Sequence, residues 1–331
     1  MESRGTGTRV LAIISIISVY FFSGCRDKRP PDTVRSEKDT TAGYITYEIP
    51  NDLEFAGEII PLNDYDLRER YDREILSNAY FHSNTILLFK RSGRWFPLMK
   101  PILEKNQLPL DFLYLPLIES GLTNMVSPKS AVGFWQLTAG SARELGLIVN
   151  NEIDERYNPL KSTEAACRYL IKAKQKFGNW INAAAAYNMG MRGLSRLMEM
   201  QKMDSYEDLL LNEETSRYIF RILAMKEIFT NPGEYGFLMS EQHYYSPEPV
   251  KEVVIGNSIP DLAEYALSLG INYKLLKRYN PWLRKNFLTI NDPSKPVVIQ
   301  VPAEHPQFVR QELHLIDSLN IGEDRYEPEE E

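Results

Sequence analysis

The sequence predicts a mainly α-helical protein that ends in a small β-α-α-β module. Between residues 64 and 230, large apolar side chains recur at helical spacing in about seven or eight segments, without the alternation of a strand. After a proline-rich stretch, the β-branched runs "KEVVIG" and "KPVVIQVP" flank two short helical patterns. These two patterns predict a helical domain over residues 61–237 and the module over residues 251–303.

The first 24 residues have the pattern of a signal peptide. Arg4 and Arg9 precede a thirteen-residue apolar run, and "SGC" follows it. The run is shorter than the roughly 20 residues that a membrane-spanning helix needs. Its "SGC" ending resembles a bacterial lipoprotein box, which implies cleavage before Cys25 and lipidation of that residue. The alternative is an ordinary cleaved signal with an incidental cysteine.

Residues 25–60 are rich in Pro, Thr and charges of both signs, so we expect a linker between membrane and domain. A lipidated Cys25 would place the protein in the cell envelope, on a membrane that faces the periplasm, and we expect the outer membrane. At the other end, residues 304–331 form an acidic tail.

Within the helical domain, the clearest element is "NPLKSTEAACRYLIKAKQKFG". Pro159 stands near its first turn and Gly178 just past its end, as helix boundaries require. Cys167 lies in this segment, where we expect a small buried thiol. The next segment, "WINAAAAYNMG", predicts a helix of small residues that packs closely, and "EETSRYIFRILAMKEIF" closes the domain.

Composition excludes some classes of function. The formal net charge of −7 does not support nucleic-acid binding, which usually needs a basic face. The four histidines are scattered, and no cysteine or histidine pair has the spacing of metal ligands. We therefore expect no metal site and no cofactor.

Glu119 is the first candidate for chemistry. It ends the apolar run that starts at Leu108, and the next acid is Glu144. Burial at such a place would raise the pKa of the carboxyl group, as a general acid requires. From the residues alone, the alternative is a structural role: the glutamate would cap a helix, pair with a cation or turn outward. Trp135 and Gln136 then offer a flat apolar face and an amide, a pairing suited to sugars, although a core turn would use them equally well.

Four blocks occur in order: "LPLIESGL", "SPKSAVGFWQLTAGSARELGL", "DERYNPLKSTEAACRYL" and "AAAAYNMG". Together they resemble the soluble-lytic-transglycosylase-like domain, most of all its membrane-bound lytic murein transglycosylase D type, over roughly residues 95–237. The resemblance implies a lysozyme-like helical fold. It also implies an enzyme that cleaves the β-1,4 bond between N-acetylmuramic acid and N-acetylglucosamine and leaves 1,6-anhydro ends, with Glu119 as its sole general acid and base.

The resemblance further implies five substrate-binding positions: Ser127, Gly133, Gln136, Tyr187 and Asn188. Tyr187 would lie near the acid, with core packing as its alternative role, and Asn188 would mainly support the loop. Two departures concern the loop. The interval from Glu119 to Ser127 is one residue shorter than in many relatives, and the proline that often follows the glutamine block is absent.

The C-terminal module resembles a LysM domain. "LLKRYNPWL" matches the second helix and the Asn-Pro that follows it. At the start of the first helix, "GNSIPDLA" departs from the usual LysM pattern. Peptidoglycan glycan strands are thus the expected partner, together with the membrane through the lipid. For the module, the alternative is a unit that packs but binds no glycan. For the whole protein, the alternatives are a non-catalytic peptidoglycan-binding lipoprotein and a hydrolytic muramidase, which would need a second carboxylate.

Overall fold

The computed structural model describes residues 45–304. The predicted signal peptide, the lipidation site at Cys25, most of the linker and nearly all of the acidic tail lie outside these residues. Within the described range, no helix is both long enough and apolar enough to cross a membrane.

A β-hairpin precedes the helices. Strands β1 (Asp52–Phe55) and β2 (Glu58–Pro61) pair antiparallel around Ala56 and Gly57, which both have positive φ angles, of 55° and 79°. Phe55 and Ile60 are fully buried in the core of the helical domain. The prediction of a linker over residues 25–60 is therefore wrong for its last part. The strands are only four residues long, too short for a clear alternation of apolar and polar residues.

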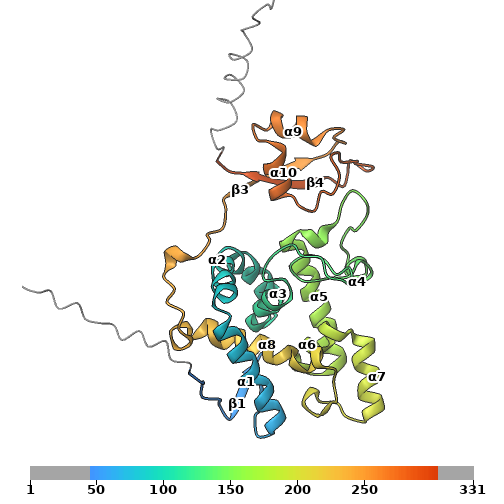
Figure 1. The fold of residues 1–331 in the computed structure, drawn as a ribbon. Helices are drawn as coiled ribbons and strands as arrows, with labels where there is room; N and C mark the ends of the chain where they lie inside the picture. Colours follow the sequence, from blue (N-terminus) through green and yellow to red (C-terminus); the bar gives the residue numbers. More distant parts are fainter. Residues whose placement is uncertain (1–44, 305–331) are drawn as a thin grey trace, which may run out of the picture. The chain divides into compact units, whose positions relative to one another are not determined.

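The helical domain follows, as predicted, and in the described residues it contains eight α-helices joined by loops and short 3-10 turns (Figure 1). The α-helices are α1 (Tyr65–Tyr80), α2 (His82–Lys105), α3 (Tyr114–Ser120), α4 (Ala139–Glu144), α5 (Pro159–Phe177), α6 (Trp180–Met189), α7 (Met191–Gln201) and α8 (Glu213–Thr230). The 3-10 turns are η1 (Leu110–Leu113), η2 (Glu155–Tyr157), η3 (Tyr206–Asp208), η4 (Pro232–Tyr235) and η5 (Glu241–His243).

The boundaries of α5 confirm the sequence prediction. The Asn158 side chain accepts hydrogen bonds from the backbone amides of the first turn, and Pro159 is the first helical residue. Gly178 ends the helix with a φ of 85°, a left-handed conformation that glycine adopts without strain. Cys167 is fully buried, and this burial raises the pKa of its thiol to about 12.

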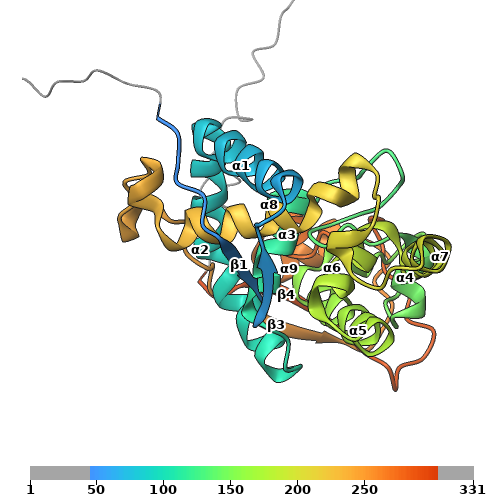
Figure 2. The same cartoon turned by 90° about the horizontal axis from the view of Figure 1, so that it is seen from below.

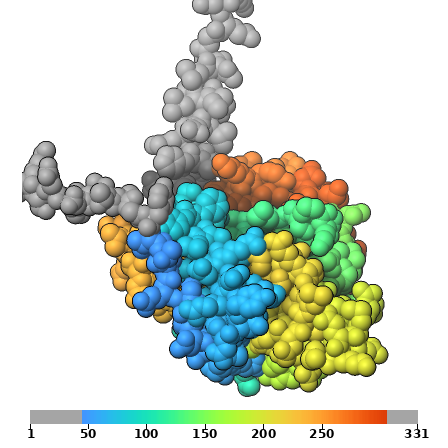
Figure 3. Space-filling model, turned by 60° about the horizontal axis from the view of Figure 1, so that its bottom comes forward, coloured from blue at the N-terminus to red at the C-terminus, as the bar shows by residue number. Residues whose placement is uncertain are grey.

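Helix α8 connects parts of the chain that are distant in sequence. It packs against α3 and α6, and it lies beside α1 (Figures 2 and 3). Between α1 and α8, the Arg217 guanidinium donates to the buried carboxylate of Glu74 at 2.5 Å, and Arg73 pairs with Glu213 at 3.1 Å. A buried carboxylate needs such a partner, so the Glu74 pair specifies how the two helices meet.

The C-terminal module has the predicted β-α-α-β order. Strands β3 (Val250–Ile255) and β4 (Val297–Pro302) pair antiparallel, with helices α9 (Leu262–Ser268) and α10 (Tyr273–Tyr279) between them in the chain. Apolar side chains from all four elements form a second core, separate from that of the helical domain.

The helical domain contributes one buried residue to this second core. Ile153, in the loop between α4 and α5, packs among the buried apolar residues of the module. Its neighbours hold it there: the Asp154 amide donates to the Trp282 carbonyl at 2.9 Å, and the Arg284 amide donates to the Glu152 carbonyl at 2.7 Å. The module is thus joined to the helical domain by backbone hydrogen bonds as well as by the chain itself.

Candidate active site

Glu119 lies at the end of α3, one residue before the last. Leu115, Pro116 and Leu117 are buried beneath it, and Gly121 terminates the helix with a φ of 59°. Burial raises the pKa of the Glu119 carboxyl above its usual range, although a hydrogen bond from Tyr218 and the charge of Arg221 act in the opposite direction. A carboxyl group in this state holds its proton to higher pH, as a general acid must.

Tyr218 is the direct partner of this carboxyl group. Its hydroxyl donates to Oε1 of Glu119 at 2.5 Å, and its side chain is almost fully buried in α8. Burial raises the pKa of Tyr218 well above its usual value, and the nearby Glu119 adds to this shift, so the hydroxyl keeps its proton and stays a donor. Sequence reasoning missed Tyr218. It lies 99 residues from Glu119 in a helix whose apolar pattern predicts core packing and nothing more.

A cavity of about 760 Å³ opens in front of Glu119. Four of the five predicted substrate-binding residues line it together with the acid: Ser127, Gln136, Tyr187 and Asn188. They come from the loop before α4 and from the end of α6. The structure thus gathers residues that span about 70 positions of the sequence around one carboxyl group.

The loop of residues 125–137 forms one wall of this cavity. Its backbone is closed by bridges from Val132 to Val126 and to Leu137. Gln136 has a φ of 48°, an uncommon conformation for a residue other than glycine and one that recurs at functional sites. Its side-chain amide nitrogen donates to the Gly133 and Met125 carbonyls at 2.7 and 3.2 Å. The amide oxygen has no partner within residues 45–304 and can accept from a ligand.

Gly133, the fifth predicted residue, does not line the cavity. It packs behind the wall, where a Cβ atom would clash with the backbone carbonyl oxygen of Arg156, and its φ is 83°. Its place in the loop is therefore explained by close packing. The contribution of Arg156 was missed from the sequence. Its guanidinium pairs with Asp154 at 2.7 Å and donates to the Ser130 and Leu137 carbonyls at 3.2 Å, so it ties the middle of the loop to its C-terminal end.

Trp135 belongs to the core. It is fully buried, and its ring nitrogen donates to the Thr163 hydroxyl at 2.8 Å. The interpretation of Trp135 as a flat sugar-binding face is therefore wrong, and the core turn is the correct alternative. Tyr187 packs edge-on against it and donates its hydroxyl to the Trp135 carbonyl at 2.6 Å, while still lining the cavity. Asn188 accepts from Thr215 at 2.8 Å, which fits a supporting role.

A second carboxylate reaches the same cavity from α8. Glu214 lines it with a largely exposed side chain, within 3.4 Å of the Asn188 amide and 4.0 Å of the Lys129 ammonium. The negative charge of Glu214 contributes to the raised pKa of Glu119. The cavity therefore contains a second acid, although the stretch of sequence after Glu119 is free of acids.

Glu119 also lines a second cavity, of about 370 Å³, which α1, α2 and α8 enclose with the end of α3. Arg91 and Arg221 are its charged residues besides Glu119. Because Glu119 is part of both walls, it lies where the two cavities adjoin. The candidate site thus includes two cavities that share the acid.

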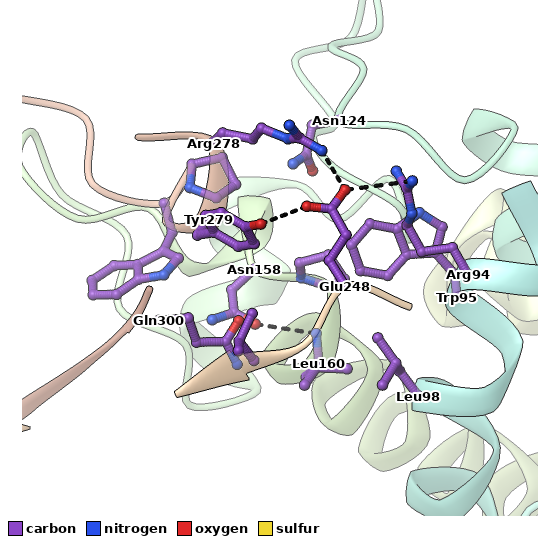
Figure 4. Close-up of a pocket in the computed structure, with 14 residues that line it drawn as sticks. Arg94, Trp95, Leu98, Asn124, Asn158, Leu160, Glu248, Arg278, Tyr279 and Gln300 are labelled. Atoms are coloured by element: carbon purple, nitrogen blue, oxygen red, sulfur yellow. Dashed lines mark hydrogen bonds and ion pairs between the residues drawn. The ribbon is translucent and has the colours of Figure 1, made fainter. Parts of the chain in front are cut away.

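A third cavity, of about 300 Å³, lies where the module meets the helical domain (Figure 4). Glu248 stands in it between Arg278 and Arg94, with its carboxylate also bonded to the Tyr279 hydroxyl. Burial acts to raise the pKa of Glu248, but the tyrosine hydroxyl and the two guanidinium groups outweigh it and lower the pKa. Glu248 therefore stays ionised and is unsuited to donate a proton, in contrast to Glu119.

Comparison with known families defines the two parts of the chain. Residues 99–209 match the model of the transglycosylase SLT domain, and residues 251–305 match that of the soluble lytic transglycosylase C-terminal LysM-like domain. The chain therefore carries an SLT domain with a LysM-like module behind it. The resemblance drawn from the four sequence blocks is confirmed.

Among individual proteins, the chain is similar to the membrane-bound lytic murein transglycosylase D of Escherichia coli (strain K12) and of Escherichia coli O6:H1. Each is 26% identical over 260 residues, which cover 77% of this chain and 55% of the relative. The chain thus spans about half the length of the curated relatives it matches.

Proposed function

We propose that this protein is a peptidoglycan lytic transglycosylase. It cleaves the β-1,4 bond between N-acetylmuramic acid and N-acetylglucosamine, and it forms 1,6-anhydro ends with Glu119 as the sole general acid and base. The observation that carries the proposal is a carboxyl group with a raised pKa, hydrogen-bonded to a buried tyrosine, at the junction of two cavities in an SLT domain.

In the first step, protonated Glu119 donates its proton to the bridging oxygen, and the bond from that oxygen to the anomeric carbon of the muramyl residue breaks. The Tyr218 hydroxyl holds Oε1, so we assign the proton transfer to Oε2. In the second step, the Glu119 carboxylate takes the proton of the muramyl 6-hydroxyl, whose oxygen closes onto the anomeric carbon. The carboxyl group is regenerated, and no water is consumed.

The change in charge on Glu119 suits both steps. The carboxyl group is neutral before the first step and anionic between the two. Burial favours the neutral form, whereas the Tyr218 hydroxyl and Arg221 favour the anion. The net effect is a raised pKa, which favours the proton donation of the first step, while Tyr218 and Arg221 stabilise the anion that the second step needs. Gln136 and Ser127 line the cavity, and we assign the Gln136 amide oxygen and the Ser127 hydroxyl to binding of substrate hydroxyl and acetamido groups.

Hydrolysis is the second candidate reaction, and Glu214 is the observation that favours it. A muramidase uses a second carboxylate as base or nucleophile, and Glu214 lines the same cavity as Glu119. The ends of the products decide between the two reactions. Mass spectrometry of released muropeptides should find anhydromuramyl ends, which Glu214→Gln should still produce. Reducing muramyl ends that disappear in Glu214→Gln would establish hydrolysis instead.

A non-catalytic peptidoglycan-binding lipoprotein would release no fragment in this assay, so the same experiment excludes or establishes that role. We further propose that a lipid on Cys25 anchors the enzyme in the outer membrane, facing the periplasm. The LysM-like module would then keep it on peptidoglycan. Support for the cell envelope comes from the similarity to the membrane-bound relatives.

A further inference from the structure

The second cavity that Glu119 lines, of about 370 Å³, has a distinct chemistry, and we name it the arginine cavity. Besides Glu119, its lining includes the polar residues Asn78, Asn84, Arg91, Thr123 and Arg221. Glu119 is the one acid among its lining residues. The cavity therefore combines two cations and two amides with a carboxyl group whose pKa is raised by burial.

Arg91 and Arg221 each make one hydrogen bond to the backbone. Arg91 Nη1 donates to the Gly121 carbonyl at 3.0 Å, and Arg221 Nη2 donates to the Ile118 carbonyl at 2.9 Å. Both side chains are half-buried. A guanidinium group has five N–H donors, so each arginine keeps donors for another partner.

Neither arginine has a carboxylate within 4.0 Å in the part of the chain that the structure describes. Other arginines of the helical domain do: Arg156 pairs with Asp154, and Arg217 with Glu74. Half-buried charges are usually paired, because burial without a partner costs free energy. Arg221 acts on the charge of Glu119, but both guanidinium groups keep free donors on one cavity and are therefore suited to bind an anion of the substrate.

A peptidoglycan strand carries such anions on the peptides attached to its muramic acid residues. Its sugar rings offer uncharged hydroxyl and acetamido groups, whereas the peptide on each muramic acid carries free carboxylates. A planar guanidinium group binds a carboxylate through two parallel hydrogen bonds. The cavity adjoins Glu119, so a strand held for cleavage brings a muramyl residue and its peptide close to these arginines.

We propose that the arginine cavity binds a carboxylate of the stem peptide, and that Arg91 is the residue that selects strands bearing peptides. This inference rests on the proposed function. It assigns the cavity a role in choosing the substrate, separate from the proton transfers of Glu119. Arg91 is the better test residue, because Arg221 also acts on the charge of Glu119.

The experiment compares Arg91→Gln with the wild type in the full-length protein. Two substrates are used: glycan strands that carry stem peptides, and the same strands after an amidase has removed the peptides. The quantity measured is the ratio of kcat/KM on the first substrate to kcat/KM on the second. We expect the substitution to lower this ratio about tenfold or more, the usual effect of losing a charge-assisted hydrogen bond.

Arg91→Lys keeps the charge without the planar fork and should recover part of the ratio. Lys100→Gln removes the same charge from the same helix at an exposed position outside the cavity, and its ratio should equal that of the wild type. An equal loss on both substrates in Arg91→Gln would show that Arg91 only supports the end of α3, and the proposal would be overturned. Wild-type protein that forms no anhydromuramyl product on either substrate would instead refute the proposed function.

A second measurement needs no variant. The wild-type reaction on peptide-bearing strands is inhibited with a soluble stem peptide and, separately, with the same peptide after its carboxylates have been converted to carboxamides. We expect the acidic peptide to inhibit more strongly. Equal inhibition by the two peptides would overturn the proposal even if Arg91→Gln failed to fold.

Discussion

The hydrogen bond from Tyr218 to Glu119 leads to a prediction about the pH dependence of the reaction. Tyr218→Phe removes the hydroxyl and keeps the ring, so the buried packing of α8 changes little. The hydroxyl stabilises the ionised form of Glu119 and thereby lowers its pKa, against the stronger effect of burial. Without the hydroxyl, the pKa of Glu119 should rise further.

The magnitude follows from the type of bond. A hydrogen bond to a charged group contributes about 1.5–3 kcal/mol. One pKa unit corresponds to about 1.4 kcal/mol, so the pKa of Glu119 should increase by about one to two units. The first proton transfer needs the protonated carboxyl group, and the fall of kcat/KM at alkaline pH reports its deprotonation. That alkaline limb should therefore move to higher pH by the same amount.

The assay is a pH profile of kcat/KM on soluble glycan strands for wild type and Tyr218→Phe. Tyr206→Phe is the matched control, since Tyr206 is another fully buried tyrosine, and its hydroxyl donates to the backbone carbonyls of Thr215 and Ser216. It should lower the melting temperature without moving the limb. A limb that stays in place in Tyr218→Phe, or moves to lower pH, would refute the reasoning about how Glu119 is held.

Three further predictions concern the acid, the anchor and the module. Glu119→Gln should abolish anhydromuramyl release, since general acid–base assistance contributes about 10²- to 10⁴-fold per transfer and both transfers use this group. The same substitution should raise the melting temperature. The folded pKa of Glu119 is raised, so its stabilising effect is complete below the unfolded pKa and is lost as pH rises through the folded pKa. Thermal melts at pH 5 and pH 9 should show a larger gain at pH 9. Cys25→Ser should abolish lipidation and leave a folded protein, which membrane fractionation in high salt checks. Removal of residues 251–331 should weaken sedimentation with insoluble peptidoglycan and spare cleavage of soluble strands, but lower the melting temperature because Ile153 loses its apolar surroundings.

Each of these has an outcome that would contradict it. Full activity in Glu119→Gln with an unchanged melt would falsify the assignment of the acid. Complete recovery of Cys25→Ser with membranes would argue for an anchor other than the lipid. Unchanged sedimentation of the shortened protein would show that the LysM-like module packs on the helical domain without holding peptidoglycan.

The sequence by itself determined the features that depend on neighbours along the chain. The spacing of apolar residues located the helices between residues 64 and 230, and Pro159 and Gly178 marked the ends of one of them correctly. The β-branched runs located the two strands of the module. Glu119 stood out because an apolar run leads directly to it. Helix periodicity, caps and β-branching act over a few residues, so their signals can be found in a short window of sequence.

Tertiary structure alone decided which side chains meet. Tyr218 reaches Glu119 from 99 residues away, and Arg156 holds the loop of Gln136 through the carbonyls of Ser130 and Leu137. Trp135 turned inward to Thr163 although its neighbour Gln136 lines the cavity. The pKa of a carboxyl group depends on burial and on partners in space. These are set by the packing of α3 against α8, and no local pattern in the sequence encodes that contact.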